Sequence, residues 1–257
     1  MIPKAIAKLP YYLRSLNSLR RIATARSIAR CAVLRGRRLN LTDGSTLELS
    51  GMIDLLVVKE TLCDDVYGLR ELNALDGVVV DVGAGIGDFT IAAASRSRRL
   101  QVLSYEPNPI AFCLLERNVA AQGYSNVTLA RAAVGTRDTY VLHDVARGPR
   151  ATAAHRGGDD TALMVDAVRL DRSLPPGPVR LLKIDCEGLE LDVLQSAAGV
   201  MGRIERVVVE FHRHLLPNAD TRVAEFLGSF GFQTRTRFDR YDESIGYVAA
   251  TRPVTNR

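Results

Sequence analysis

The 257-residue chain has no tryptophan, few cysteines and no apolar run near the roughly 18 residues that a membrane-spanning helix needs. The cysteines show no CxxC spacing, which argues against a disulfide scaffold or a zinc ribbon and favours a reducing compartment. Hydrophobic residues make up 47% of the chain and charges of both signs are mixed among them, which excludes a wholly disordered protein. The length predicts one large domain. The four cysteines are Cys31, Cys63, Cys113 and Cys186.

Acidic residues are absent from positions 1–38, which hold ten Lys or Arg. The whole chain has 34 basic and 29 acidic residues, so residues 39–257 keep 24 basic residues against all 29 acidic ones. Apolar residues recur in the basic segment at three- and four-residue spacings, as in an amphipathic helix. We therefore predict a basic amphipathic helical extension over 1–38 and a globular domain over 39–257.

Two roles of the extension fit its composition equally well. It either packs on the core of the domain or contacts the phosphates of an anionic membrane, and an organelle transit peptide has a similar composition. Nucleic acid is not an expected partner, because aromatic residues interleave with the basic ones only at Tyr11 and Tyr12 and the remaining chain is acidic. We expect a cytoplasmic protein that is either free or peripheral at the inner face of the membrane.

Short apolar runs alternate with helical patterns from Val78 onward, which indicates a parallel sheet with helices on both faces. A hairpin around Asp43-Gly44 and a helix over 57–72 are expected before it. The stretch 143–160 is predicted to be a long loop. Strands are predicted over 78–82, 101–105, 127–130, 181–185, 207–210, 233–237 and 247–250, and helices over 89–95, 189–198 and 221–230, with a further helix that starts at Asn108-Pro109 and ends before Gly123.

A glycine-rich turn follows the first predicted strand and opens a helix. Its glycines allow a ligand to approach the backbone closely. The position where a dinucleotide-binding GxGxxG turn has its third glycine holds Asp88, whose charge would repel a pyrophosphate. Glu106 ends the next strand and can accept hydrogen bonds from both ribose hydroxyls. Charge therefore favours S-adenosylmethionine (SAM) over NAD. The turn comprises Asp81, Val82, Gly83, Ala84, Gly85, Ile86 and Gly87.

Acidic and histidine side chains follow two later strands. Asp185 and Glu187 end one of them, and Glu210 and His212 end the next, so all four are expected at one edge of the sheet. These groups can orient an acceptor hydroxyl, and His212 is a candidate general base. A divalent cation held by the four residues is an alternative that no fixed ligand spacing supports. Glu190 is expected in a solvated helix start.

Together these motifs resemble the FkbM family of SAM-dependent methyltransferases, over about residues 52–250. The hallmark Lys-Ile-Asp-x-Glu-Gly-x-Glu is matched by Lys183–Glu190, which is the most specific part of the resemblance. Gly85 replaces an asparagine that is common in the family, and the basic, alanine-rich stretch 147–160 departs from it. The other matching segments are Asp81–Gly87, Tyr105–Pro107 with Asn108-Pro109, Leu170-Asp171, Glu210–His212 and Leu227–Phe232.

The resemblance implies a Rossmann-like, seven-stranded, mostly parallel sheet of the class I methyltransferases, with the last strand antiparallel. It also implies methyl transfer from SAM to a hydroxyl of a sugar, glycan, lipid-linked saccharide or natural product. A nicotinamide-dependent oxidoreductase and a non-catalytic membrane-associated scaffold are the alternatives. In this assignment the acceptor-facing residues are Asp185, Glu187, Glu210 and His212, and the cofactor-binding residues are Asp81, Gly83, Ala84, Gly85, Gly87, Glu106, Pro107 and Asn108.

Overall fold

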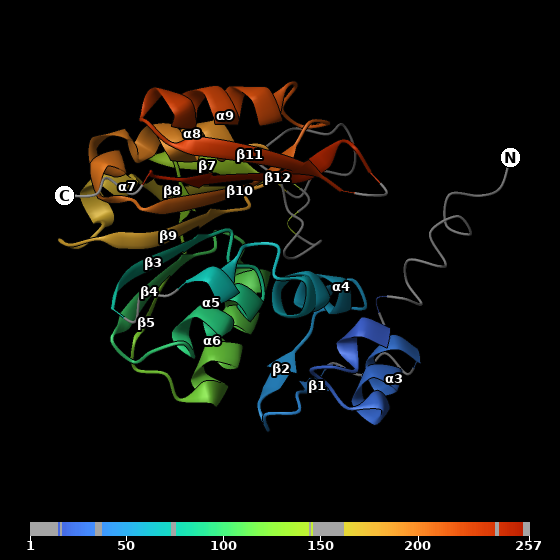
Figure 1. Ribbon diagram of the computed structural model, residues 1–257. Helices are drawn as coiled ribbons and strands as arrows, with labels where there is room; N and C mark the ends of the chain where they lie inside the picture. The colour runs from blue at the N-terminus through green and yellow to red at the C-terminus, as the bar shows by residue number, and fades with distance from the viewer. Residues whose placement is uncertain are drawn as a thin grey trace, which may run out of the picture.

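The computed structural model describes residues 15, 17–33, 38–72, 76–143, 145, 162–239 and 242–253 (Figure 1). Its centre is a seven-stranded sheet with the strand order β11-β12-β10-β9-β3-β4-β5. All strands run parallel except β12, which is antiparallel to both of its neighbours. The predicted Rossmann-like fold class and all seven predicted strands are confirmed. The strands are β3 (Gly77–Val82), β4 (Leu100–Tyr105), β5 (Val127–Ala130), β9 (Val179–Ile184), β10 (Arg206–His212), β11 (Gln233–Phe238) and β12 (Ile245–Thr251).

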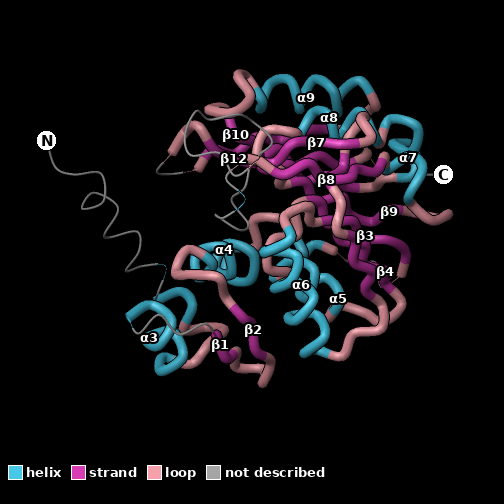
Figure 2. The backbone as a smooth tube through the Cα atoms, turned by 180° about the vertical axis from the view of Figure 1, so that it is seen from behind, coloured by secondary structure: helices cyan, strands magenta, loops and turns pink. Residues whose placement is uncertain are grey.

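Helices cover both faces of the sheet, as Figures 1 and 2 show. Alternate residues of a strand point to opposite faces, so Val80 packs with α8 and α9 whereas Val79 packs with α5. Asn108 caps α6 by accepting the backbone N–H groups of Ile110 and Ala111, as the sequence predicts. The helices are α5 (Asp88–Ala94), α6 (Pro109–Gln122), α7 (Leu170–Ser173), α8 (Glu190–Ser196) and α9 (Ala219–Ser229), with the 3₁₀ helix η4 (Ala198–Arg203).

Two smaller sheets accompany the central one. The predicted hairpin forms from β1 (Arg38–Asn40) and β2 (Thr46–Glu48), which pair in an antiparallel register. The second sheet has three strands in the order β6-β8-β7 and was not predicted from the sequence. It follows β5 along the chain and carries part of the wall of the pocket described below. Its strands are β6 (Ala133–Val134), β7 (Thr139–Leu142) and β8 (Leu163–Val168).

The prediction of one continuous helix over 57–72 is wrong. The segment forms α4 (Asp54–Val58), then the π-helix η1 (Lys59–Asp64), and after a turn the 3₁₀ helix η2 (Leu69–Glu71). Asp65 has a φ of 55°, which ends η1, and its carboxylate accepts the backbone N–H groups of Leu69 and Arg70. This turn carries Tyr67 toward the carboxyl ends of the central strands.

The described part of the basic extension packs into the domain. Leu19, Ala23, Ile28 and Cys31 are buried in one apolar cluster with residues of the hairpin, α4 and α6. They lie in α3 (Ala25–Val33) and in the segment before it, so this part of the extension packs on the core of the domain, which is one of the two roles that its composition allows. Residues 1–14 and most of the predicted loop at 143–160 lie outside the described residues. Among the described helices, none has both the length and the apolar character that a membrane crossing requires.

Candidate active site

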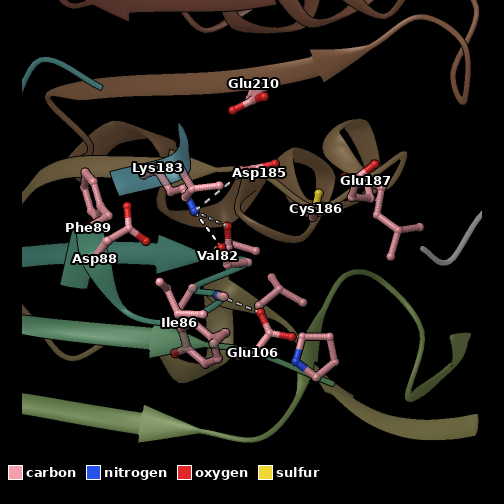
Figure 3. Close-up of a pocket in the computed structure, with 18 of the residues that line it drawn as sticks. Val82, Ile86, Asp88, Phe89, Glu106, Lys183, Asp185, Cys186, Glu187 and Glu210 are labelled. Carbon is pink, nitrogen blue, oxygen red and sulfur yellow. Dashed lines mark hydrogen bonds and ion pairs between the residues drawn. The ribbon is translucent and has the colours of Figure 1, made fainter. Parts of the chain in front are cut away.

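A cavity of about 550 Å³ opens at the carboxyl ends of the central parallel strands (Figure 3). The glycine turn after β3 and the segment after β4 line one part of it, and the segments after β9 and β10 line another. Ile53, just before α4, Val57 of α4 and Glu60 of η1 also belong to its wall. Its size lies within the range of small-molecule sites, and crevices at the carboxyl ends of strands are where α/β sheets bind ligands.

The glycine turn brings backbone to the pocket surface. Gly83, Gly85 and Gly87 have φ values of 76°, 55° and 90°, which side chains rarely tolerate. A Cβ atom on Gly83 would overlap the carbonyl oxygen of Asp185, so β3 and β9 can approach closely at this point only with glycine there. Gly83, Ala84 and Gly85 line the cavity. Gly87 does not belong to the lining and is the N-cap residue of α5.

Glu106 lies at the cavity wall with its carboxylate held by backbone donors. Its Oε2 accepts the N–H of Gly85 at 2.8 Å, and its Oε1 accepts the N–H of Asn108 at 2.9 Å. Burial raises the pKa of Glu106 to about 7. Pro107 also lines the cavity, whereas Asn108 lies outside the lining and donates from Nδ2 to the carbonyl of Val145. The side chain of Asn108 therefore shapes this corner through hydrogen bonds to backbone groups of neighbouring segments.

Asp81 is fully buried and does not line the cavity. Its Oδ1 lies 3.0 Å from Nζ of Lys183, and its Oδ2 accepts the hydroxyl of Thr90. Burial alone would lower the pKa of Lys183, but Asp81 and Asp185 raise it above its usual value. The predicted contact between Asp81 and the amino group of a cofactor stays a prediction, and these contacts do not favour it.

Asp88 lies in the cavity wall at the first residue of α5. Burial raises its pKa to about 6. A phosphate bound at the N-terminus of this helix would meet a carboxylate at the position where dinucleotide-binding turns have glycine. The placement agrees with a ligand that carries no phosphate.

The four predicted acceptor-side residues line the same end of the cavity. Nε2 of His212 lies 3.8 Å from Oε2 of Glu187 and 3.9 Å from Oε1 of Glu210. One donor atom each from Asp185, Glu210 and His212 lie within 4.8 Å of one another, an arrangement that could hold a metal ion. Figure 3 shows Asp185, Glu187 and Glu210 on the side of the pocket opposite Glu106.

Glu190 supports His212 from beneath the pocket. Its carboxylate lies 2.9 Å from Nδ1 of His212 and accepts the N–H of Gly188, and Glu190 is fully buried. The expectation that Glu190 is a solvated helix start is therefore wrong. Burial alone would lower the pKa of His212, but Glu190 and the nearby carboxylates raise it to about 10. An imidazole that is already protonated cannot accept a proton, so a base role for His212 requires a bound positive charge that displaces this proton.

Two functional side chains were missed from the sequence as site residues, Tyr67 and Lys183. The hydroxyl of Tyr67 donates to Oε2 of Glu210 at 2.8 Å and lies 3.3 Å from Oδ2 of Asp185. Lys183 is part of the hallmark segment and was available as a signal, but no local pattern pointed to Tyr67. Its position depends on the turn after η1.

Residues 81–234, more than half of the chain, match the family model described as the methyltransferase FkbM domain. The chain belongs to the FkbM methyltransferase family. It is therefore a methyltransferase, as the sequence motifs predicted.

Relatives of this FkbM protein are known at low identity. Methyltransferase 1 of Beauveria bassiana is 27% identical over 177 residues, which cover 59% of this chain and 71% of that protein. Hexuronic acid methyltransferase AglP of Haloferax volcanii is 25% identical over 154 residues, which cover 58% of this chain and 61% of that protein. A crystal structure of an FkbM methyltransferase from Methylobacillus flagellatus has a TM-score of 0.48 and 15% identity, and the match covers 95% of this chain and 59% of that one.

Proposed function

We propose that this enzyme transfers a methyl group from SAM to a hydroxyl of a saccharide-containing acceptor. The observation that carries the proposal is the shared cavity: Glu106 and the glycine turn line one part, and Asp185, Glu187, Glu210 and His212 line the other. One pocket thus offers a nucleoside site next to groups that can orient a hydroxyl and accept its proton.

The cofactor end suits SAM in its donor set. Each oxygen of Glu106 accepts one backbone N–H and keeps a further lone pair, so the carboxylate can still accept two ribose hydroxyls. Asp88 disfavours a phosphate, whereas a positively charged sulfonium is compatible with the nearby carboxylates. When bound, SAM supplies a methyl group on a positively charged sulfur. The same charges argue against the nicotinamide alternative.

The residues of the acceptor end align the hydroxyl and remove its proton. The hydroxyl oxygen forms a bond to the methyl carbon while the carbon–sulfur bond breaks and leaves its electron pair on sulfur. The hydroxyl proton passes to the carboxylate of Glu187 or Glu210, or to His212 once the positive charge of the bound cofactor has displaced the proton that its imidazole carries. Alignment contributes most to such a displacement, so the rigid placement of these groups at strand ends is suited to it.

Saccharides are the proposed acceptor class because they present hydroxyls to a polar, acid-lined pocket, and a relative is named a hexuronic acid methyltransferase. A lipid-linked saccharide would fit the surface next to the pocket. Ile53 and Val57 line the cavity and are partly exposed, as is Met52 beside them. Exposed arginines of α3 and the turn before it, Arg20, Arg21, Arg26 and Arg30, would contact anionic lipid headgroups at a peripheral, cytoplasmic membrane face.

Calorimetry with SAM and with NAD tests the cofactor. Binding of SAM without NAD is expected, and binding of NAD without SAM would exclude the proposal. A methyl-transfer assay with labelled SAM against glycan and lipid extracts tests the acceptor class. Label in the saccharide fraction, stable to mild alkali as an ether is, is the expected result. Alkali-labile label would indicate a methyl ester instead of O-methylation of a hydroxyl.

Cosedimentation with vesicles tests the membrane contact. Replacement of Arg20, Arg21, Arg26 and Arg30 by glutamine should weaken binding to vesicles with anionic lipid, by about 1 kcal/mol for each residue near the surface. SAM binding should remain unchanged. Equal binding of both proteins to the vesicles would remove this part of the proposal.

A further inference from the structure

We propose that Asp185, Glu210 and His212 form a binding site for one divalent cation of the Mn²⁺ class at the acceptor end of the pocket. The part of this cation in catalysis rests on the proposed function, whereas its binding can be measured separately. The site deepens the assignment of the pocket, because it gives the acceptor hydroxyl a positively charged anchor next to the carboxylates.

The three donor atoms come from the ends of two adjacent parallel strands. They lie within 4.8 Å of one another. An octahedral cation with bonds of about 2.1 Å separates neighbouring donors by roughly 3 Å and opposite donors by roughly 4.2 Å. At most one pair of three ligands can be opposite, and Oε1 of Glu210 lies 3.9 Å from Nε2 of His212. The donors therefore have to draw together by roughly 1 Å when the ion binds. Two carboxylates suit Mg²⁺ and Mn²⁺, and the imidazole shifts the preference toward Mn²⁺.

His212 supplies an observation that is independent of the carboxylates. Its side chain is 5% exposed, and Nδ1 is occupied by Glu190 at 2.9 Å. Nε2 faces the pocket and makes no hydrogen bond to any described residue, since the oxygens of Glu187 and Glu210 lie 3.8 and 3.9 Å away. Nε2 is therefore the ring nitrogen that is open to the cavity, where it can bind a metal ion together with the carboxylates beside it. A carboxylate on the far ring nitrogen is also the usual support of a metal-binding histidine.

Tyr67 orients the two carboxylates. Its hydroxyl donates to Oε2 of Glu210 at 2.8 Å and lies 3.3 Å from Oδ2 of Asp185. The other oxygen of Glu210, Oε1, is the one that faces Nε2 of His212. One oxygen of Glu210 is thus fixed by the phenol and the other is directed to the shared space. Hydrogen bonds of this kind to ligating carboxylates are typical of metal sites.

The local charge also favours a cation. Four carboxylates surround His212 at this end: Asp185, Glu187, Glu190 and Glu210. The nearby Lys183 lies 3.9 Å from Asp185, but its Nζ is 3.0 Å from Asp81 and donates to the carbonyl of Gly83 at 2.6 Å. Its charge is therefore largely matched by Asp81, so Lys183 does not neutralise the carboxylates at the acceptor end.

With three groups engaged as ligands, Glu187 remains to accept the hydroxyl proton. Its carboxylate is part of the same wall, and its side chain is 27% exposed. Glu187 has a φ of 48°, a conformation that costs a non-glycine residue energy and is found where a site requires it. A cation beside the acceptor hydroxyl would lower the pKa of that hydroxyl, so a carboxylate is a sufficient base.

The test measures Mn²⁺ binding to the full chain after it has been stripped with a chelator. Loss of the electron paramagnetic resonance signal of free Mn²⁺ should show one bound ion per chain. His212→Ala and Asp185→Asn should abolish this binding, and Glu190→Gln should weaken it by about 10- to 100-fold. Glu187→Gln should keep it while methyl transfer falls. Glu225→Gln, an exposed residue of α9, is the matched control and should bind Mn²⁺ as the parent does.

The variants can be compared because circular dichroism and calorimetry with SAM report whether each is folded. Folded stripped protein that binds no Mn²⁺, or binds it equally after His212→Ala and Asp185→Asn, would overturn the cation site. Failure of the proposed function has a different signature: Mn²⁺ would bind as expected, but SAM would not. Methyl transfer that is unaffected by chelation in a protein that binds no Mn²⁺ would reject the site and retain the methyltransferase assignment.

Discussion

Nζ of Lys183 lies 3.0 Å from Oδ1 of Asp81, and this ion pair is buried beneath the glycine turn. The same Nζ donates to the carbonyl of Gly83 at 2.6 Å. The pair therefore joins β9 to β3 and to the turn that forms the cofactor end of the pocket. An acid before a glycine turn and a lysine in the hallmark segment thus act together, although about a hundred residues separate them.

Lys183→Met should destabilise the protein strongly. The substitution leaves the Asp81 carboxylate buried without its partner, and breaking a buried pair costs about 3–5 kcal/mol. Urea denaturation would show this as a lower free energy of unfolding. Arg180→Met is a suitable control, because Arg180 pairs with the exposed Asp76 and such pairs contribute about 0–1 kcal/mol. Equal losses in the two variants would contradict a structural role of the buried pair.

The sequence predicted the sheet well because its strands are short, continuous apolar runs between glycines and helical patterns. Continuous apolar runs such as 78–82 and 207–210 are typical of buried parallel strands. The placement of Asp185, Glu187, Glu210 and His212 at one edge also followed, because the carboxyl ends of parallel strands meet at one edge. Local pattern and topology were sufficient for these features.

The pairing of side chains across the sheet was not predictable in the same way. Glu190 reads as an acid in the first turn of a helix, and only the packing of α8 against β10 brings it to His212. Tyr67 reaches Glu210 through a left-handed turn at Asp65 that a helical pattern conceals. The basic segment was divided from the domain by charge, although Leu19 is buried in its core. Contacts between distant segments decided each of these cases.

Leu19→Ala tests the place of the basic segment in the fold. Leu19 is fully buried with residues of the hairpin and α6, so the substitution should lower the free energy of unfolding by about 2–5 kcal/mol. Arg20→Ala, at the exposed neighbouring position, should change it by no more than about 0.5 kcal/mol. Chemical denaturation of both variants gives the comparison. A detachable extension would instead leave the stability unchanged in both.

SAM affinity should depend on pH through Glu106. Burial raises the pKa of Glu106 to about 7, and the ionised carboxylate is the form that accepts two ribose hydroxyls. The Kd for SAM should therefore rise as the pH falls from 8 to 6. The effect on stability has the opposite sign. Because the pKa of Glu106 is higher in the folded than in the unfolded chain, its contribution to stability is fully present at pH values below the unfolded-state pKa. This contribution is lost as the pH rises through about 7.

Calorimetry at several pH values checks this assignment with Glu106→Gln as the comparison. The amide cannot ionise and replaces one acceptor with a donor. The loss of charged hydrogen bonds, about 1.5–3 kcal/mol, should weaken SAM binding about 10- to 150-fold at pH 8 and remove this pH dependence. A variant that keeps the parent's pH profile would show that another group controls it.

Tyr67→Phe should reduce methyl transfer more than it reduces stability. The phenyl ring can keep the edge-to-face packing of Tyr67 on Phe89 and Tyr247, whose ring centroids lie 5.4 and 5.8 Å away. The lost hydroxyl, however, no longer donates to Glu210, so that carboxylate loses its fixed orientation at the acceptor end. Steady-state kinetics should show a fall of about tenfold or more in kcat, as expected for a hydrogen bond of about 1.5–3 kcal/mol to a charged group.

Tyr140→Phe is the matched control, because the hydroxyl of Tyr140 donates to Asp192 and lies outside the pocket lining. Tyr140→Phe should lose stability and keep its kcat. A fall in kcat in Tyr140→Phe but not in Tyr67→Phe would show that the hydroxyl of Tyr67 does not orient the acceptor end.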